Sequence, residues 1–230
     1  MTTRTWISLL GICLAISVIA GIAEGKINPT WTSRLYLPDF SQNTNRHTPL
    51  QTQGQYLPPV INKDTTISPE NGPIILKSIT HVNPGTTLTL APGTVIYAHE
   101  YAGITVAGTL NAVGTESKPI TLISNEAHLL NKVWAGITWQ NNAKGIIKYA
   151  TFDNASPAIT CTDQSNVAIS NITTSNSNTG IIQTSPNCLI SKSTIKFSKE
   201  GVVTNNTNQS DINFINTKTN IKTILTTPPL

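Results

Sequence analysis

The stretch from Ala135 to Cys161, AGITWQNNAKGIIKYATFDNASPAITC, repeats a simple pattern. A small residue alternates with isoleucine at steps of 11 residues, with a single step of 10. The series is Gly136, Ile147, Ala158, Ile169, Gly180, Ile190, Gly201 and Ile212. Aligned on the small residue, this part of the chain falls into lines of 22, 22, 21 and 21 residues. Such a period is too short for repeats built from paired helices.

Each line holds two short apolar runs, such as Ile137–Trp139 and Ile146–Phe152, separated by Asn, Ser, Asp or Thr. Short strands joined by polar corners are typical of one rung of a solenoid. Charged residues are only 11% of the chain, so paired Glu and Lys side chains along helices are not available to support the fold. The sequence therefore predicts stacked parallel rungs, with the isoleucines inside and the small residues and asparagines at the corners.

A looser version of the same pattern precedes this region, in residues 83–124. Apolar residues alternate there, and Pro84-Gly85 and Pro92-Gly93 mark turns. Gly103 precedes Gly136 by 33 residues, which is more than one rung. We expect the excess to form a loop at Asn125–Val133.

The motifs PGTTLTLAPGTVIY, ITVAGTLNAVGTESKPITLIS and WAGITW, followed by the regular lines, resemble the parallel β-helix repeat proteins of bacterial envelopes and surfaces. The resemblance extends from Ile67 to Thr217. It implies an all-β domain over residues 67–220, a right-handed single-stranded parallel β-helix with rungs of about 22 residues. The same solenoid carries lyases, hydrolases, epimerases, adhesins and passive surface proteins, so the resemblance specifies the fold and not the activity.

The N-terminal residues 1–27 predict export through a hydrophobic leader helix. The run from Trp6 to Ala23 is uncharged, and Gly21 and Ala23 form a small-x-small cleavage pattern. Its length fits either a cleaved signal peptide or a retained N-terminal membrane anchor through residues 6–23. Residues 28–66 are rich in Pro, Gln and Asn and predict a linker, and residues 221–230 predict a C-terminal tail. The expected location is periplasmic, cell-surface or secreted.

The distribution of charge argues against a nucleic-acid partner. The net charge is +4, yet all three arginines precede residue 50 and the lysines are scattered. A nucleic-acid partner is not expected, because its recognition needs a clustered basic surface.

The two cysteines of the predicted domain occupy different phases of the repeat. Cys161 lies three residues after Ala158, and Cys188 lies eight residues after Gly180. These different phases of the repeat favour two buried free thiols over a disulfide, and that alternative stays open.

Catalytic chemistry is poorly represented. The resemblance implies that enzymes of this fold would use clustered carboxylates, with calcium and a basic residue in lyases or paired aspartates in hydrolases. Here Asp153, Asp163 and Asp211 share no stack position, and the predicted domain contains no arginine. No catalytic, cofactor-binding or metal-binding residue is assigned. The residual candidates for acid and base chemistry are in the irregular first half: His99, Glu100, Tyr101 and His128.

These observations predict an exported β-helix scaffold, similar to an adhesin, that presents a polar Asn/Ser/Thr face. The expected partner is a polysaccharide or another cell-envelope polymer, with no cofactor. The alternative is a polysaccharide-active enzyme, a lyase or glycoside hydrolase of the pectate-lyase-like β-helix type.

Overall fold

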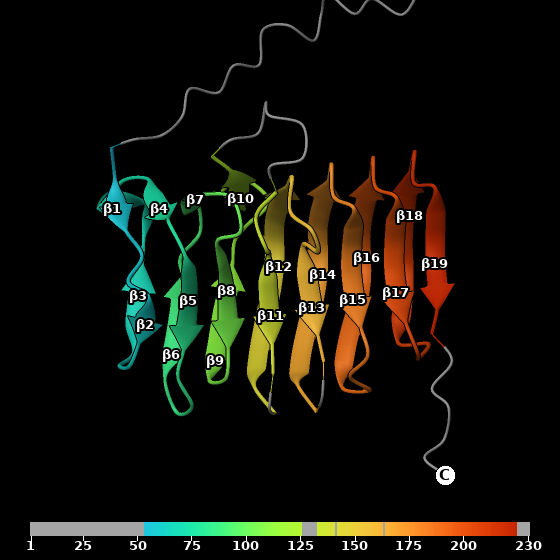
Figure 1. Cartoon of the computed structure of the whole chain (residues 1–230), viewed down its shortest axis with the longest axis horizontal. Helices are drawn as coiled ribbons and strands as arrows, with labels where there is room; N and C mark the ends of the chain where they lie inside the picture. Colours follow the sequence, from blue (N-terminus) through green and yellow to red (C-terminus); the bar gives the residue numbers. More distant parts are fainter. Residues whose placement is uncertain (1–52, 126–132, 141, 163, 225–230) are drawn as a thin grey trace, which may run out of the picture. The chain divides into compact units, whose positions relative to one another are not determined.

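The computed structural model describes residues 53–125, 133–140, 142–162 and 164–224. They form an all-β parallel solenoid of about 7 turns with rungs of about 22 residues (Figure 1). The predicted leader helix at residues 1–27 lies outside the described residues. The first strand begins at Gln55, within the segment predicted as a linker, and the short strands Gln55–Tyr56 and Val60–Ile61 pair with the following rung.

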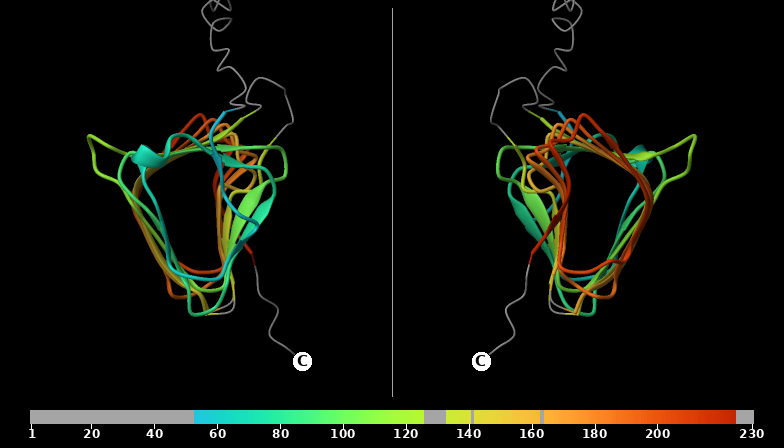
Figure 2. Two further views of the ribbon diagram at one scale, coloured as in Figure 1. Left: turned by 90° about the vertical axis from the view of Figure 1, so that its left-hand side faces the viewer. Right: turned by 90° about the vertical axis from the view of Figure 1, so that its right-hand side faces the viewer.

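Three faces surround the core, as the views along the solenoid axis show (Figure 2). Face 2 is an eight-stranded parallel sheet. Its strands are β2 (Val60–Ile61), β5 (Ile79–Val82), β8 (Gly103–Val106), β11 (Ile137–Trp139), β13 (Ile159–Cys161), β15 (Thr179–Gln183), β17 (Glu200–Thr204) and β19 (Thr219–Thr223).

An eleven-stranded sheet forms the other two faces. Face 1 begins with β1 (Gln55–Tyr56), β4 (Ile74–Leu76), β7 (Val95–Ala98) and β10 (Ile120–Ser124). Face 3 begins with β3 (Thr65–Ile67), β6 (Thr87–Leu90) and β9 (Thr109–Val113). Four longer strands then run across both faces: β12 (Lys144–Asp153), β14 (Asn166–Ser175), β16 (Cys188–Lys196) and β18 (Gln209–Ile215). Strand β12 joins the two arrangements, since it pairs with β9 through its first half and with β10 through its second half.

The predicted isoleucine stack is confirmed. Ile147, Ile169 and Ile190 are successive partners in the parallel ladder of face 3, and all three are buried. The small residues also align, because the strands that follow them pair in register. At Gly136, with φ of 68°, a Cβ atom would collide with the backbone of Pro157 and Ala158 on the next rung. Rungs therefore approach closely where the sequence repeats a small residue.

The stack does not continue to Ile212, the last residue of the spacing series. Ile190 pairs with Gln209, and Ile212 pairs with Ser193 beyond the following corner. Gln209 follows Thr204 by five residues, whereas Ile190 follows Gln183, the ladder partner of Thr204, by seven, so glutamine takes the inward place of isoleucine. The core therefore becomes polar at its C-terminal end, where the Thr204 hydroxyl donates to Gln183 Oε1 at 3.2 Å.

The corner between faces 3 and 1 changes along the solenoid. In the first rungs it is a wide loop: residues 68–73, 91–94 and 114–119 separate the strands. From β12 onward one residue in the left-handed region turns the chain. These residues are Tyr149, Asn171, Lys192 and Asp211, with φ between 47° and 52°. Left-handed residues also mark the next corner, at Asn154, Asn176, Phe197 and Asn216. Asparagine at corners, as predicted, accounts for half of these positions, because its short polar side chain tolerates this conformation.

A search of the residues that the structure describes finds no helix long and apolar enough to cross a membrane. The predicted membrane segment, residues 6–23, lies outside that part of the chain.

Candidate functional site

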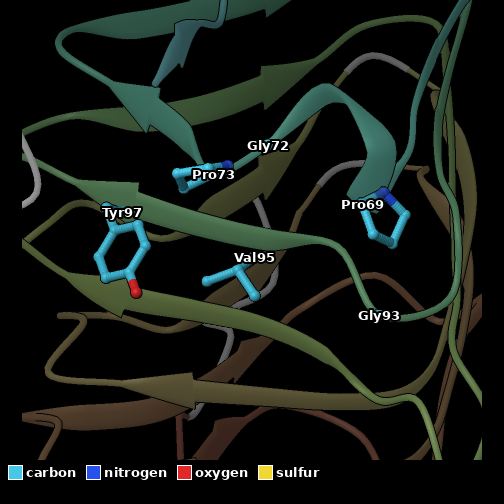
Figure 3. A pocket seen from close by; sticks show the side chains of 6 residues that line it. All are labelled: Pro69, Gly72, Pro73, Gly93, Val95 and Tyr97. Carbon is cyan, nitrogen blue, oxygen red and sulfur yellow. The ribbon is translucent and has the colours of Figure 1, made fainter. Parts of the chain in front are cut away.

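A groove follows the wide corners between faces 3 and 1. It consists of two adjoining hollows that share Pro69 and Gly93. The smaller hollow has a volume of about 210 Å³ and is lined by Pro69, Gly72, Pro73, Gly93, Val95 and Tyr97 (Figure 3). The larger has a volume of about 570 Å³ and is lined by Ser68, Pro69, Glu70, Ala91, Pro92, Gly93, Thr115 and Lys118. The groove therefore crosses successive rungs.

The first wall of the groove is a single turn of 3-10 helix, η3 (Pro69–Asn71). Ser68 precedes it and forms a capping box with Asn71: the Asn71 side-chain oxygen accepts the Ser68 backbone N–H at 2.7 Å. Pro69 suits the first helical position, because its missing N–H would have no partner there. Gly72 ends the turn with φ of 75°. The sequence Ser-Pro-Glu-Asn-Gly thus fixes the rim locally.

The second wall is the turn Ala91-Pro92-Gly93-Thr94. The Thr94 N–H donates to the Ala91 carbonyl at 3.1 Å, and Gly93 has φ of 84°. Proline followed by a left-handed glycine is the pattern of a type II turn. In the third wall, the Thr115 N–H donates to the Lys118 carbonyl at 3.1 Å, and the Lys118 N–H donates to Thr115 Oγ1 at 3.0 Å. Each wall is held by its own turn hydrogen bonds, so the groove is preformed.

The groove combines apolar surface, one aromatic ring and a few polar groups. Tyr97 projects from β7 beside Val95 and is half-buried (Figure 3). Glu70 and Lys118 bring opposite charges to the larger hollow, and both are exposed. Such a surface suits a ligand with apolar ring faces and hydroxyl groups, because tyrosine offers both a flat apolar ring and a polar hydroxyl.

A row of threonines continues from the groove along face 1. Val95 pairs with Thr121, and the ladder then passes through Thr151, Thr173 and Thr194. All four threonines are half-exposed. Successive strands of a sheet lie about 4.8 Å apart, so the hydroxyls form a regular line parallel to the solenoid axis. Sequence reasoning missed both the groove and this row, and the available signals were the Pro-Gly turns and the recurring Thr in these strands.

The predicted acid and base candidates lie at a different corner, between faces 1 and 2. The structure describes three of the four, as consecutive residues after β7, whereas His128 lies outside the described residues. His99 Nε2 is 3.4 Å from the side-chain nitrogen of Asn125 on the next rung. Tyr101 has φ of 61° and its side chain is 72% exposed. None of these three residues lines either hollow of the groove.

Two aspartates of the regular rungs, Asp153 and Asp211, have structural roles. Asp153 Oδ1 accepts hydrogen bonds from Ser175 Oγ at 2.6 Å and from Asn176 Nδ2 at 2.7 Å, which joins it to the next rung. Asp211 occupies an exposed tight corner. Across the described ranges, no group of three His, Cys, Asp or Glu residues is placed to hold a metal ion.

Comparison of the chain with protein-family models, with curated proteins and with solved structures finds no match. The fold and the groove are therefore the observations on which function can be argued.

Proposed function

We propose that the protein is an exported β-solenoid scaffold, similar to an adhesin, which binds a polysaccharide or another cell-envelope polymer in the groove between faces 3 and 1. The groove itself is the observation that carries this proposal. It is preformed, spans adjacent rungs, and exposes an aromatic ring next to polar groups. A preformed site binds without the cost of ordering its loops.

The direction of the groove supports a polymeric ligand. It runs across rungs, and the threonine row continues from Val95 along the same face. A chain of sugars lying along the axis would stack one ring on Tyr97 and place its further hydroxyls near Thr121 and Thr151. The opposite charges of Glu70 and Lys118 favour a neutral or weakly charged polymer over a polyanion.

The resemblance to parallel β-helix proteins also supports three further parts of the proposal: a right-handed coil, export, and a bacterial envelope or surface as the setting. Crossovers between parallel strands of one sheet are almost always right-handed, which favours the proposed right-handed coil. The uncharged run from Trp6 to Ala23 favours export, with cleavage or anchoring as the two routes. A bacterial envelope or surface is the proposed setting, and fractionation of cells expressing the full chain tests it. Soluble cytoplasmic protein with Met1 intact would contradict export.

The experiment for the groove compares two tyrosines. The full chain and its variants are screened against immobilised neutral glycans and polyuronates, with and without calcium. Tyr97→Ala should weaken binding at least tenfold, because it removes the ring that a sugar would stack on. Tyr101→Ala is the matched control, since it removes an exposed aromatic residue from the other corner, and it should bind as the original chain does.

Two results would overturn this assignment. Equal binding by the Tyr97→Ala variant would place the ligand elsewhere on the solenoid. Release of sugars by the full chain that is lost on joint replacement of His99, Glu100 and Tyr101 by alanine would favour the alternative function, a polysaccharide lyase or glycoside hydrolase. The enzyme reading also predicts unsaturated products in a calcium-dependent lyase reaction.

A further inference from the structure

Cys161 and Cys188 approach each other inside the solenoid, although they belong to different rungs. Cys161 is the last residue of β13 on face 2, and Cys188 is the first residue of β16 on face 3. Both side chains are buried. The sequence argument that their different phases keep them apart is wrong, because the corner between faces 2 and 3 brings the two phases together. The same prediction also placed both cysteines in the interior, and both are buried.

The backbone around this corner fixes the approach. The Ser185 N–H donates to the Cys161 carbonyl at 3.2 Å, and the Ser185 carbonyl accepts the Cys188 N–H at 3.3 Å. Gln183 is the ladder partner of Cys161 on the next rung, and its amide donates to the Cys188 carbonyl at 2.6 Å. One short turn therefore holds both cysteine backbones through hydrogen bonds, and both side chains are in the core on either side of this turn.

We propose that Cys161 and Cys188 are a disulfide site that, in an oxidising compartment, covalently joins two successive rungs at the corner between faces 2 and 3. The oxidant is a low-molecular-weight disulfide such as oxidised glutathione. One protein thiolate attacks it and releases a glutathione thiolate, and the second protein thiolate then displaces the other glutathione. The protein gains one S–S bond and gives up two protons, while two electrons convert the oxidant into two thiols.

The timing of this step follows from burial. Desolvation raises the pKa of the Cys161 thiol well above its usual range, and the neighbouring Cys188 thiol adds to the rise. The thiolate is the reacting species, so the folded and closed rungs react slowly. The disulfide therefore forms while the chain folds, or when the rungs open locally. This inference does not depend on the ligand of the groove.

The test uses refolding of the full chain, which has three cysteines: Cys13, Cys161 and Cys188. Reduced, denatured protein is refolded in an equimolar mixture of reduced and oxidised glutathione, quenched in acid, and alkylated in denaturant. Mass spectrometry of the intact protein should show a single alkylated cysteine and the loss of two hydrogen atoms. Peptide mapping should join the peptides of Cys161 and Cys188. The oxidised protein should melt about 5 to 10 °C above the same sample after reduction.

The variants Cys161→Val and Cys188→Ala separate the disulfide from a general effect of the redox buffer. Each should refold without an intramolecular bridge, and its melting temperature should not respond to reduction. Three alkylated cysteines in the original chain after equilibration would overturn the proposal, as would a mapped bridge from Cys13. A second sample that has never been unfolded should form the same bridge more slowly.

Discussion

The first and second halves of the solenoid turn the same corner in different ways. Between faces 3 and 1, the first rungs use loops that contain proline and left-handed glycine, such as Pro92-Gly93. From Tyr149 onward a single left-handed residue makes the turn. Both solutions keep the parallel ladder intact on either side, because β12 pairs with β9 and β10 at the same time.

The difference teaches where a surface for binding arises. A one-residue corner keeps the strands of two faces continuous. The wide corners project beyond the faces, and three of them on adjacent rungs enclose the groove. In the tight-cornered half the regular feature is the interior: an apolar stack of isoleucines runs through it and ends at Gln209. We therefore expect mutations to separate stability, which depends on the stack, from binding, which depends on the wide corners.

The largest effect should come from the stack in the tight-cornered half. Ile169→Asn replaces a buried ladder partner of Ile147 and Ile190 with an amide that has no partner. Lost burial and the unpaired polar group should lower the free energy of unfolding by about 4 kcal/mol, measured by denaturant titration. Ala168→Asn, on the exposed side of the same strand, is the control and should cost less than about 1 kcal/mol. Equal melting of both variants would mean that the register is wrong.

At the wide corners, Gly93→Ala should cost about 1 to 2 kcal/mol. Its φ of 84° is unfavourable for alanine, and the new Cβ would lie 3.3 Å from the Pro69 ring across the groove. Gly85→Ala is closely matched, because Asn83-Pro84-Gly85-Thr86 forms the same kind of turn and nothing lies within 4 Å of the new Cβ. Thermal unfolding should show a slightly smaller loss for Gly85→Ala. Only the Gly93 variant should alter ligand binding.

At the tight corners, a matched pair of lysines on β16 tests the left-handed turn. Lys192 has φ of 47°, so glycine should relieve about 1 kcal/mol of backbone strain and leave stability unchanged or slightly higher. Lys196 lies within the same strand, and Lys196→Gly should lower stability by up to about 1 kcal/mol. Chemical denaturation of the two variants gives the comparison. A larger loss for Lys192→Gly would contradict the assignment of this residue as a strained corner.

The smallest effect concerns the last rung. The Lys222 ammonium contacts the Glu200 carboxylate at 2.7 Å, and this hydrogen bond lowers the pKa of Glu200. The pair therefore stabilises the fold above the unfolded pKa of glutamate, about 4.3. That contribution is lost as the pH falls through the lower, folded pKa. It should amount to only a few tenths of a kcal/mol, because the pair is partly exposed and screened. Glu200→Gln should flatten the dependence of stability on pH in this acidic range, and added salt should have a similar effect.

The repeat made the stack predictable, whereas the corners resisted prediction. Because small residues and isoleucines recur at fixed steps, only one register places like residues above like. The stacking of Ile147, Ile169 and Ile190 could therefore be predicted. The pairing of Ile190 with Gln209 was not predicted, because a corner rich in Asn and Thr gives no indication of how many residues it contains. Cys161 and Cys188 show the same limit, since phase along the repeat does not reveal which positions meet across a corner.

The candidate site was missed for a related reason. Pro92-Gly93 was read correctly as a turn, but a groove requires knowing which turns lie on adjacent rungs. The regular alignment begins only at Gly136, after the loop expected at Asn125–Val133. That insertion also hides the threonine row, because Thr121 and Thr151 are ladder partners across it. Candidates chosen by side-chain chemistry alone, such as His99, fell at the neighbouring corner instead.

The last rung that the structure describes predicts where the solenoid opens locally. Ile221 follows Val202 in the face 2 ladder, yet it is 49% exposed whereas Val202 is fully buried. A stack of rungs behaves like a one-dimensional lattice in which each member is held by its neighbours, and a member whose inner residues are poorly covered opens first. Backbone amides should therefore exchange with deuterium fastest in β18 and β19, more slowly in β16 and β17, and slowest in the central strands β11 to β14. Opening that proceeds inward from this end would reach the rung of Cys188 before that of Cys161.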